Sequence, residues 1–312
     1  MRIEDIIMQK ILWTDVERAA KKNFADLIMR CENHFQEQIN VVADEIYNRR
    51  RTRIILVAGP SSSGKTTFSR LLNDELQEKG VKVHYIGMDD FFIDRVKVPF
   101  LASGVRDFDS PVALDMPLLN EVVGGVLRSE WVEIPEYDFL KGERKKEKTF
   151  LRLHDEDVVI IEGIHALNPA VIGDNDSSDI VKISIKPRKT YVMPSGKLFP
   201  PDELRLLRRT IRDFYTRGYD LKETSAQWDE VLKAEQKYIT PYTDYADYFI
   251  DSAFDYELFI YKQCVGNALD GCDIAKYADI KEVLAEVSLL PKTEIPKTSL
   301  LNEFAISSDS QA

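Results

Sequence analysis

One segment limits the folds open to this 312-residue chain more than any other. Residues 59–66 read GPSSSGKT and fit the pattern G-x-x-x-x-G-K-[ST], whose glycines let successive N–H groups face phosphate oxygens. The pattern needs a strand before it and a helix after it. Both are expected, because 53–58 (RIILVA) is a short apolar run and 66–79 has helical periodicity. The sequence therefore predicts a nucleoside triphosphate site on a strand–loop–helix unit.

Each part of this loop has an expected contact with the nucleotide. In this pattern Lys65 reaches the β and γ phosphates, and the hydroxyl of Thr66 is a ligand for Mg²⁺. The positive N-terminal end of the following helix faces the same phosphates. We therefore assign nucleotide binding to nine consecutive residues: Gly59, Pro60, Ser61, Ser62, Ser63, Gly64, Lys65, Thr66 and Thr67.

Four more strand-like runs follow, separated by helical stretches. They lie at 81–87, 157–161, 181–186 and 248–252. Strands that alternate with helices indicate βαβ units, and therefore an α/β fold with a five-stranded, mainly parallel sheet and helices on both faces. Between the second and third strands, the segments at 131–139 and 148–153 predict a β-hairpin.

The two ends of the chain lack this alternation. Residues 1–50 are rich in helix formers and predict an N-terminal extension of amphipathic helices, which we interpret as packing or dimer-forming. We expect one α/β domain at 51–285. Pro291 and Pro296 interrupt a C-terminal extension at 286–312, whose last residues, 307–312, are expected to fray.

Charge and composition limit the partners. The chain has 42 Lys and Arg against 53 Asp and Glu, and its net charge of −11 argues against a general nucleic-acid binder. Three scattered cysteines predict reduced thiols rather than a disulfide framework. No export signal opens the chain, and its apolar runs are far shorter than the roughly 20 residues that span a bilayer. We expect a cytoplasmic protein without membrane or nucleic-acid partners, and a homo-oligomer stays open.

Acidic residues follow two of the predicted strands. Asp89 and Asp90 follow the run at 81–87, and Glu162 follows the run at 157–161. Because ligands lie beyond the carboxyl ends of parallel strands, these acids are expected near the phosphate loop. Phosphoryl transfer needs a metal and a carboxylate that orients or deprotonates the attacking hydroxyl. Asp89 is our candidate base and Glu162 a candidate magnesium ligand, and the alternative for the two aspartates is a helix cap or turn.

Residues 204–217 (LRLLRRTIRDFYTR) predict a helix with a basic face. Arginines recur at i, i+3, i+4 and i+7, and a glycine after the last arginine suits a helix C-terminus. We predict that at least two of the four face phosphate, because guanidinium binds phosphate through paired hydrogen bonds. The alternative is a solvated face paired with nearby acids. The residues concerned are Arg205, Arg208, Arg209 and Arg212, with Asp202, Glu203 and Asp213 as the acids.

Taken in order, these motifs resemble the uridine kinase family, within the phosphoribulokinase/uridine kinase group of P-loop kinases. The resemblance covers roughly residues 50 to 265. It rests on GPSSSGKTT (59–67), MDDFF (88–92), FDSP (108–111), YDF (137–139), IEGIHALNP (161–169) and RRTIRDFYTRGYD (208–220). Together with IEGIHALNP, PYTDYADYFIDSAFDYEL (241–258) and the C-terminal SLLNEF (299–304) are similar to a bacterial branch.

The resemblance implies an enzyme that transfers the γ-phosphate of ATP or GTP to the 5′-hydroxyl of a nucleoside, most often uridine or cytidine. It implies that Asp89 activates this hydroxyl and that Thr66, Asp89 and Glu162 surround Mg²⁺. The remaining positions carried over are Asp109 for the ribose hydroxyls, Tyr137 and Phe139 for the base, Gln227 for the substrate, and the lid arginines Arg209, Arg212 and Arg217 for the phosphates.

The chain departs from the family pattern at two positions near the base. Gly142 stands where members that prefer uridine or cytidine have histidine, and Tyr219 stands where they have arginine. Our hypothesis is that His165 replaces part of the missing base recognition; the alternative is a histidine packed under its strand. Two other functions stay open: a kinase for another small alcohol, such as pantothenate or a sugar phosphate, and a nucleotide-binding regulatory protein with little turnover.

Overall fold

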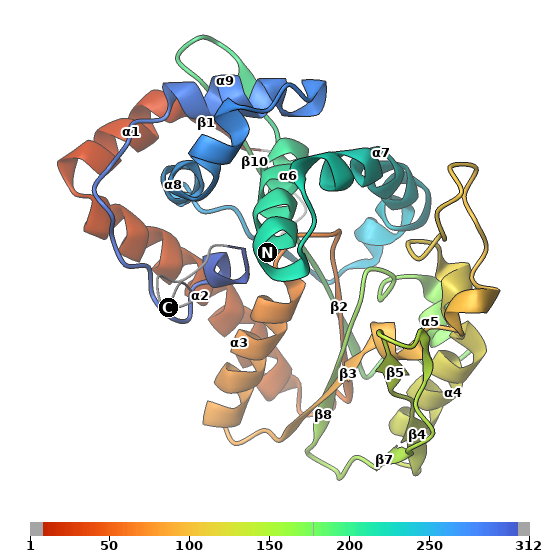
Figure 1. The fold of residues 1–312 in the computed structure, drawn as a ribbon. Helices are drawn as coiled ribbons and strands as arrows, with labels where there is room; N and C mark the ends of the chain where they lie inside the picture. Colours follow the sequence, from red (N-terminus) through yellow and green to blue (C-terminus); the bar gives the residue numbers. More distant parts are fainter. Residues whose placement is uncertain (1–8, 177, 305–312) are drawn as a thin grey trace.

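The computed structural model describes residues 9–176 and 178–304, and its centre is a five-stranded sheet (Figure 1). The strand order is β12-β9-β2-β8-β3, and every neighbouring pair is parallel. Each predicted run matches one strand to within two residues at either end: β2 (Ile54–Ala58), β3 (Val83–Gly87), β8 (Val158–Glu162), β9 (Ile180–Lys186) and β12 (Tyr248–Asp251). The predicted α/β fold with a parallel sheet is confirmed.

Alternate residues of the central strand β2 face two helical layers. Ile55 and Val57 belong to one apolar cluster, and Ile54 and Leu56 belong to another. Because side chains alternate across a strand, a strand covered on both faces is apolar throughout. The first cluster includes residues of α3 (Lys65–Glu78), α6 (Pro201–Arg212), α7 (Leu221–Tyr238), α8 (Glu257–Asp270) and α9 (Ala278–Glu286), and the second those of α4 (Met116–Leu127) and α5 (Pro169–Ile172).

The helices that precede β2 pack on the same core as the sheet. α1 (Trp13–Lys22) and α2 (Phe24–Arg49) place Trp13 and Ile39 in the cluster that contains β2 residues. Asn23 lies between the two helices and caps α2, because its side chain accepts a hydrogen bond from the first turn. The predicted N-terminal helices are therefore present, and their apolar faces cover the sheet.

A second, three-stranded sheet was not predicted. β1 (Gln9–Leu12) pairs in parallel with β10 (Lys189–Val192), and β10 pairs in antiparallel with β11 (Leu198–Phe199). Each strand has four residues or fewer, so none carries a periodic pattern of its own. β1 depends on pairing with residues far along the chain, whereas β10 and β11 form a local hairpin.

The predicted hairpin between β3 and β8 is present as two short ladders. β4 (Val132–Ile134) pairs in antiparallel with β7 (Thr149–Leu151). Nearer the turn, β5 (Tyr137–Asp138) pairs with β6 (Glu143–Arg144). The YDF sequence (137–139) therefore begins in the ladder nearer the turn, which β5 and β6 form.

The arginine-rich segment begins as α6 and ends as one π-helical turn, Asp213–Arg217. Gly218 ends it in the left-handed conformation, with a φ of 69°, as the sequence predicts. Beyond α9, the chain leads to a short 3₁₀ helix, Leu300–Glu303, which contacts α3 (Figure 1). The predicted fraying at 307–312 lies outside the described residues. Among the helices that the structure describes, none is both long and apolar enough to cross a membrane.

Candidate active site

The loop at 59–64 turns sharply between β2 and α3. Ser62 and Gly64 both have left-handed backbones, with φ angles of 60° and 89°. Gly59 lies so close to β9 that an added Cβ would be 2.2 Å from the carbonyl oxygen of Ile185. Gly64 caps α3 without a side chain, so the first N–H groups of this helix have no partner within it. Such an arrangement binds phosphate.

The first turn of α3 meets the end of β8. Thr66 Oγ1 donates a hydrogen bond to Glu162 Oε2 at 3.1 Å. The hydroxyl of Tyr85, on the neighbouring strand β3, donates to the same oxygen at 2.6 Å. Lys65 Nζ lies over the loop, 3.3 Å from the carbonyl oxygen of Pro60. The structure thus brings three predicted residues together and adds Tyr85, whose hydroxyl no sequence pattern had marked.

Asp89 lies in a 3₁₀ turn, Met88–Phe91, that follows β3 at the same edge of the sheet. The side chain of Asp89 is exposed at the surface, but neighbouring protein atoms displace much of the water around its carboxyl group. This burial and the negative charge of Glu162 raise the pKa of Asp89 to about 6, against the opposing charges of Lys65 and Arg217. A carboxyl group with this pKa can accept a proton near neutral pH.

The neighbouring Asp90 has a different place in the structure. Its Oδ1 accepts a hydrogen bond from the Tyr137 N–H at 3.1 Å, which ties the turn after β3 to the hairpin. This contact with the hairpin is neither the helix cap nor the local turn that was the alternative for the two aspartates. Asp90 therefore has a structural role, because it joins two segments of the chain.

The oxygens around Asp89 suit a magnesium ion. Mg²⁺ binds through one or two carboxylates and keeps water or phosphate as its other ligands. Thr66, Glu162 and Asp89 offer hydroxyl and carboxylate oxygens beside the phosphate loop. Within residues 9–176 and 178–304, no three His, Cys, Asp or Glu side chains are grouped to hold a metal by themselves. Phosphate oxygens of a nucleotide would therefore have to complete the coordination.

A row of aromatic rings begins next to Asp90. The ring centroids of Phe92 and Phe108 lie 5.3 Å apart, those of Phe92 and Tyr137 5.7 Å, and those of Tyr137 and Phe139 5.2 Å, all edge to face. Tyr137 is 4% exposed, whereas Phe139 is 56% exposed. Phe139 therefore presents a ring on which a base can stack, and Tyr137 supports it from within.

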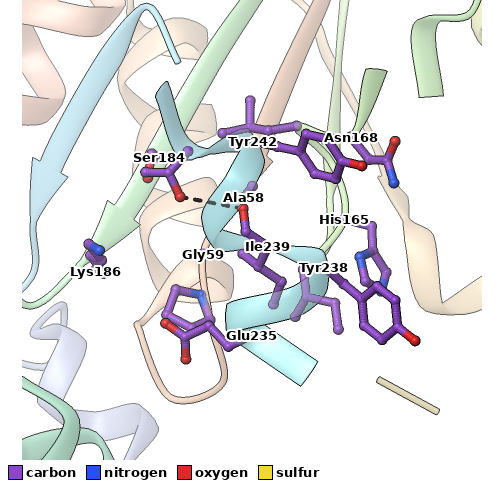
Figure 2. A pocket seen from close by; sticks show the side chains of 14 residues that line it. Ala58, Gly59, His165, Asn168, Ser184, Lys186, Glu235, Tyr238, Ile239 and Tyr242 are labelled. Atoms are coloured by element: carbon purple, nitrogen blue, oxygen red, sulfur yellow. Dashed lines mark hydrogen bonds between the residues drawn. The ribbon is translucent and has the colours of Figure 1, made fainter. Parts of the chain in front are cut away.

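His165 is hydrogen-bonded to the main chain of Asp109. Its Nε2 lies 3.0 Å from the carbonyl oxygen of Asp109, so this nitrogen donates. Burial lowers the pKa of His165 to about 4, and the ring is neutral. It lines a small cavity of about 10 Å³ together with Gly59 and Tyr238 (Figure 2). His165 is thus placed to fix the backbone of Asp109, and its contact with a base stays a prediction.

Two of the four arginines on the predicted basic face, Arg205 and Arg208, are buried and are each paired with an acid. We call these two arginines the buried pair. Arg205 is 1% exposed and donates to Glu235 at 2.6 Å, and Arg208 is 0% exposed and donates to Glu257 at 2.8 Å. Both also donate to main-chain oxygens of the loop at 59–64. These two guanidinium groups are therefore neutralised within the protein, and the prediction that at least two of the four arginines face phosphate depends on Arg209 and Arg212.

The other arginines converge on one buried carboxylate. The nearest nitrogen-to-oxygen distances to Asp213 are 3.1 Å for Arg209, 3.5 Å for Arg212 and 3.4 Å for Arg217. Burial and the neighbouring arginines lower the pKa of Arg212 to about 10. We call these four residues the arginine cluster. With three positive charges against one negative, it suits an anion with more charge than a single carboxylate, such as a nucleotide.

Arg209 connects the arginine cluster to the loop and to predicted substrate residues. Its Nη1 donates to Ser61 Oγ and its Nη2 to Gln227 Oε1, both at 3.1 Å. Burial raises the pKa of Asp109, and the positive charge of Arg209 opposes this rise. The predicted substrate residue Gln227 therefore contacts a residue predicted to hold phosphate, and the charge of that residue also acts on Asp109.

The departure from the family pattern at Gly142 has a steric reason. Its φ is +76°, and an added Cβ would lie 2.7 Å from Arg95 Nε. Arg95 donates its main-chain N–H to the Gly142 carbonyl at 2.7 Å and its guanidinium to the Phe139 carbonyl. A histidine could fit only if Arg95 moved. The second departure, Tyr219, is 39% exposed.

The C-terminal 3₁₀ helix supplies two contacts that the sequence analysis missed. Leu300 packs against Gly64, and Glu303 accepts a hydrogen bond from Thr67. No local pattern could show this, because more than 230 residues separate the partners. The one available signal is the SLLNEF segment, which the resemblance had already singled out.

Comparison with known proteins identifies the family of this chain. The sequence model of the phosphoribulokinase / uridine kinase family matches residues 54–258. Uridine kinases from Streptococcus uberis and Anoxybacillus flavithermus are 31% and 30% identical to this chain, each over 65% of it and 87% of their own length. A structure of "a Possible Uridine Kinase" from Bacillus stearothermophilus covers 64% of this chain and 89% of its own, at 20% identity and a TM-score of 0.40. This chain therefore belongs to the phosphoribulokinase/uridine kinase family of P-loop kinases.

Proposed function

We propose that this chain is a nucleoside kinase that transfers the γ-phosphate of ATP, or GTP, to the 5′-hydroxyl of a nucleoside, with uridine or cytidine preferred. One observation carries the proposal: two acids assigned to the acceptor side lie within electrostatic range of cations assigned to the phosphate side. Asp89 interacts with Lys65 and Arg217, and Asp109 interacts with Arg209. A hydroxyl at Asp89 would thus lie beside the groups that hold the terminal phosphate. Kinship with uridine kinases supports a nucleoside as acceptor.

In this proposal the chain supplies position and charge. The loop amides and Lys65 hold the β and γ phosphates, and the arginine cluster neutralises charge on the transferred group. Asp89 accepts the proton of the attacking hydroxyl, whose oxygen bonds to the γ-phosphorus while the bond to the β-phosphate oxygen breaks. Thr66, Asp89 and Glu162 would hold Mg²⁺, which when bound neutralises the phosphate oxygens.

Replacing Asp89 tests the proposal most directly. With ATP, Mg²⁺ and uridine, Asp89→Asn should lower kcat by about 10²–10⁴-fold, because the amide cannot accept the proton. ATP binding, measured by calorimetry, should persist. Asp90→Asn is the matched control, since its amide oxygen can still accept from Tyr137, and it should retain most activity. Near-normal turnover by Asp89→Asn would contradict the assigned role.

A second candidate acceptor is an alcohol with a negative group, such as pantothenate or a sugar phosphate. Arg95, exposed beside Phe139, favours this reading. The other nearby arginines are engaged: Arg106 donates to the Val98 carbonyl, and Arg144 pairs with Asp115 at 3.1 Å. A panel of nucleosides, pantothenate and sugar phosphates, with ATP and Mg²⁺, separates the candidates. ATP binding without turnover of any acceptor would point to a regulatory protein.

A further inference from the structure

The C-terminal 3₁₀ helix places a carboxylate on the phosphate loop. The hydroxyl of Thr67 donates to Glu303 Oε2 at 2.9 Å, and its main-chain N–H lies 3.4 Å from the same oxygen. Thr67 is the third residue of α3, and bonding within the helix starts with the next amide, of Phe68, which donates to the Gly64 carbonyl. Glu303 therefore accepts a hydrogen bond from the N–H of Thr67, which is the last of the backbone amides that have no partner within the helix at its N-terminus.

The backbone that carries Glu303 is firmly packed. Leu300 is fully buried, and an added Cβ on Gly64 would lie 2.3 Å from its Cδ1. Phe304 is 2% exposed, and the Arg208 guanidinium lies over its ring, 5.1 Å from the centroid. The side chain of Glu303 is only partly buried. The backbone can therefore stay in place while the carboxylate turns away.

A carboxylate at this point uses the same donors that a phosphate would use. The N-terminal end of a helix favours either anion. Two anions cannot share Thr67 without repulsion, and this repulsion is larger near a protein surface than in bulk water. The negative charge of Glu303 acts on Arg212 and partly offsets the lowering of the Arg212 pKa. A displaced carboxylate therefore has a cation toward which it can turn.

We propose that Glu303 sets the affinity for the phosphate donor by competing with a phosphate oxygen for the hydroxyl and N–H of Thr67. The inference rests on the proposed function only in that the loop binds a nucleoside triphosphate. Binding must displace the carboxylate, so the wild-type chain binds ATP more weakly than its loop would without Glu303. Between turnovers the same carboxylate caps α3.

Two variants of the full chain test this competition. Glu303→Gln removes the charge but keeps an oxygen that Thr67 can reach, and Glu303→Ala removes both. Glu294→Gln is the control, because it removes one exposed negative charge from the same C-terminal segment. Calorimetry with ATP and Mg²⁺, with pyrophosphate, and with adenosine measures binding, and thermal unfolding without nucleotide measures stability.

We expect both Glu303 variants to bind ATP and pyrophosphate roughly twofold to fivefold more tightly, the range for a unit charge at a helix terminus. Adenosine binding should not change, and the Glu294 control should match the wild type. The unfolding midpoint should fall slightly in both variants, because α3 loses a negative charge at its N-terminus, and it should fall further in Glu303→Ala, which also loses the hydrogen bond from Thr67. A purely structural cap would lower stability without tightening ATP binding, so the two readouts should move in opposite directions.

ATP affinity that is unchanged or weaker in both Glu303 variants would overturn the inference. Failure of the proposed function looks different. If no acceptor is phosphorylated while Glu303→Gln still binds ATP more tightly than the wild type, the inference stands and the kinase proposal falls. If the wild type and both variants are folded but bind no ATP, both fall.

Discussion

The two halves of the arginine helix follow one sequence pattern and differ in chemistry. In the buried pair, Arg205 contacts two acids, Asp202 and Glu235, and Arg208 contacts the buried Glu257. Both arginines also donate to main-chain oxygens of the phosphate loop. The arginine cluster shares a single carboxylate among three guanidinium groups and keeps a net positive charge beside the same loop. The number of acids facing each arginine, rather than its place in the repeat, separates a structural role from a ligand-binding one.

The largest effect should come from the buried pair. Arg208→Ala should lower the free energy of unfolding by about 3–5 kcal/mol, because it leaves Glu257 charged and unpaired at 0% exposure. Chemical denaturation without nucleotide measures this loss. The double variant Arg208→Met, Glu257→Leu should recover most of the stability, since no buried charge remains. If the free energy of unfolding of Arg208→Ala is within about 1 kcal/mol of the wild-type value, the distinction between the buried pair and the arginine cluster is wrong.

Arg212→Ala should have the opposite effects to Arg208→Ala: a large loss of activity and little loss of stability. We expect kcat to fall by about 10²–10³-fold, because a donor to the transferred phosphate is lost. The free energy of unfolding should change by less than about 1 kcal/mol, since two arginines still face Asp213. Steady-state kinetics and denaturation of one preparation measure both, and Arg212→Lys controls for charge alone. A stability loss as large as that of Arg208→Ala would contradict this assignment.

Asp213→Asn should move stability and ATP affinity in opposite directions. Without their shared carboxylate, the three arginines repel one another, and we expect about 1–2 kcal/mol lower stability without nucleotide. The greater positive charge should tighten ATP binding a few-fold, by calorimetry. High salt should reduce this gain. Weaker ATP binding by a folded Asp213→Asn protein would show that the carboxylate orders the cluster for phosphate.

Arg217→Ala should have the smallest effect. Its side chain is 49% exposed and its nitrogen lies 3.4 Å from Asp213, so solvent screens the pair. Stability should change by less than about 0.5 kcal/mol. The KM for ATP should rise a few-fold, because one cation of the arginine cluster is lost. An unchanged KM and kcat would remove Arg217 from the phosphate-binding group.

Much of the fold could be predicted because its signals are local. The five strands are apolar runs next to turn residues, and acids at strand ends could be placed at one sheet edge before any contact was known. Asp202, three residues from Arg205, could be predicted as its partner. Glu235 and Glu257 could not, because they lie 30 and 49 residues from their arginines. The contact of Glu303 with Thr67 spans 236 residues and depends on packing alone.

The contact between Gly64 and Leu300 has a consequence for how the protein is made. All five strands of the central sheet have been synthesised once residue 251 is added. Leu300, which packs against the phosphate loop, is added only after residues 252–299. At about 5–20 residues per second, a ribosome needs several seconds to add this stretch. During that interval Glu303 is absent from the nascent chain, so the proposed competition with a phosphate oxygen can begin only after all five strands have been made.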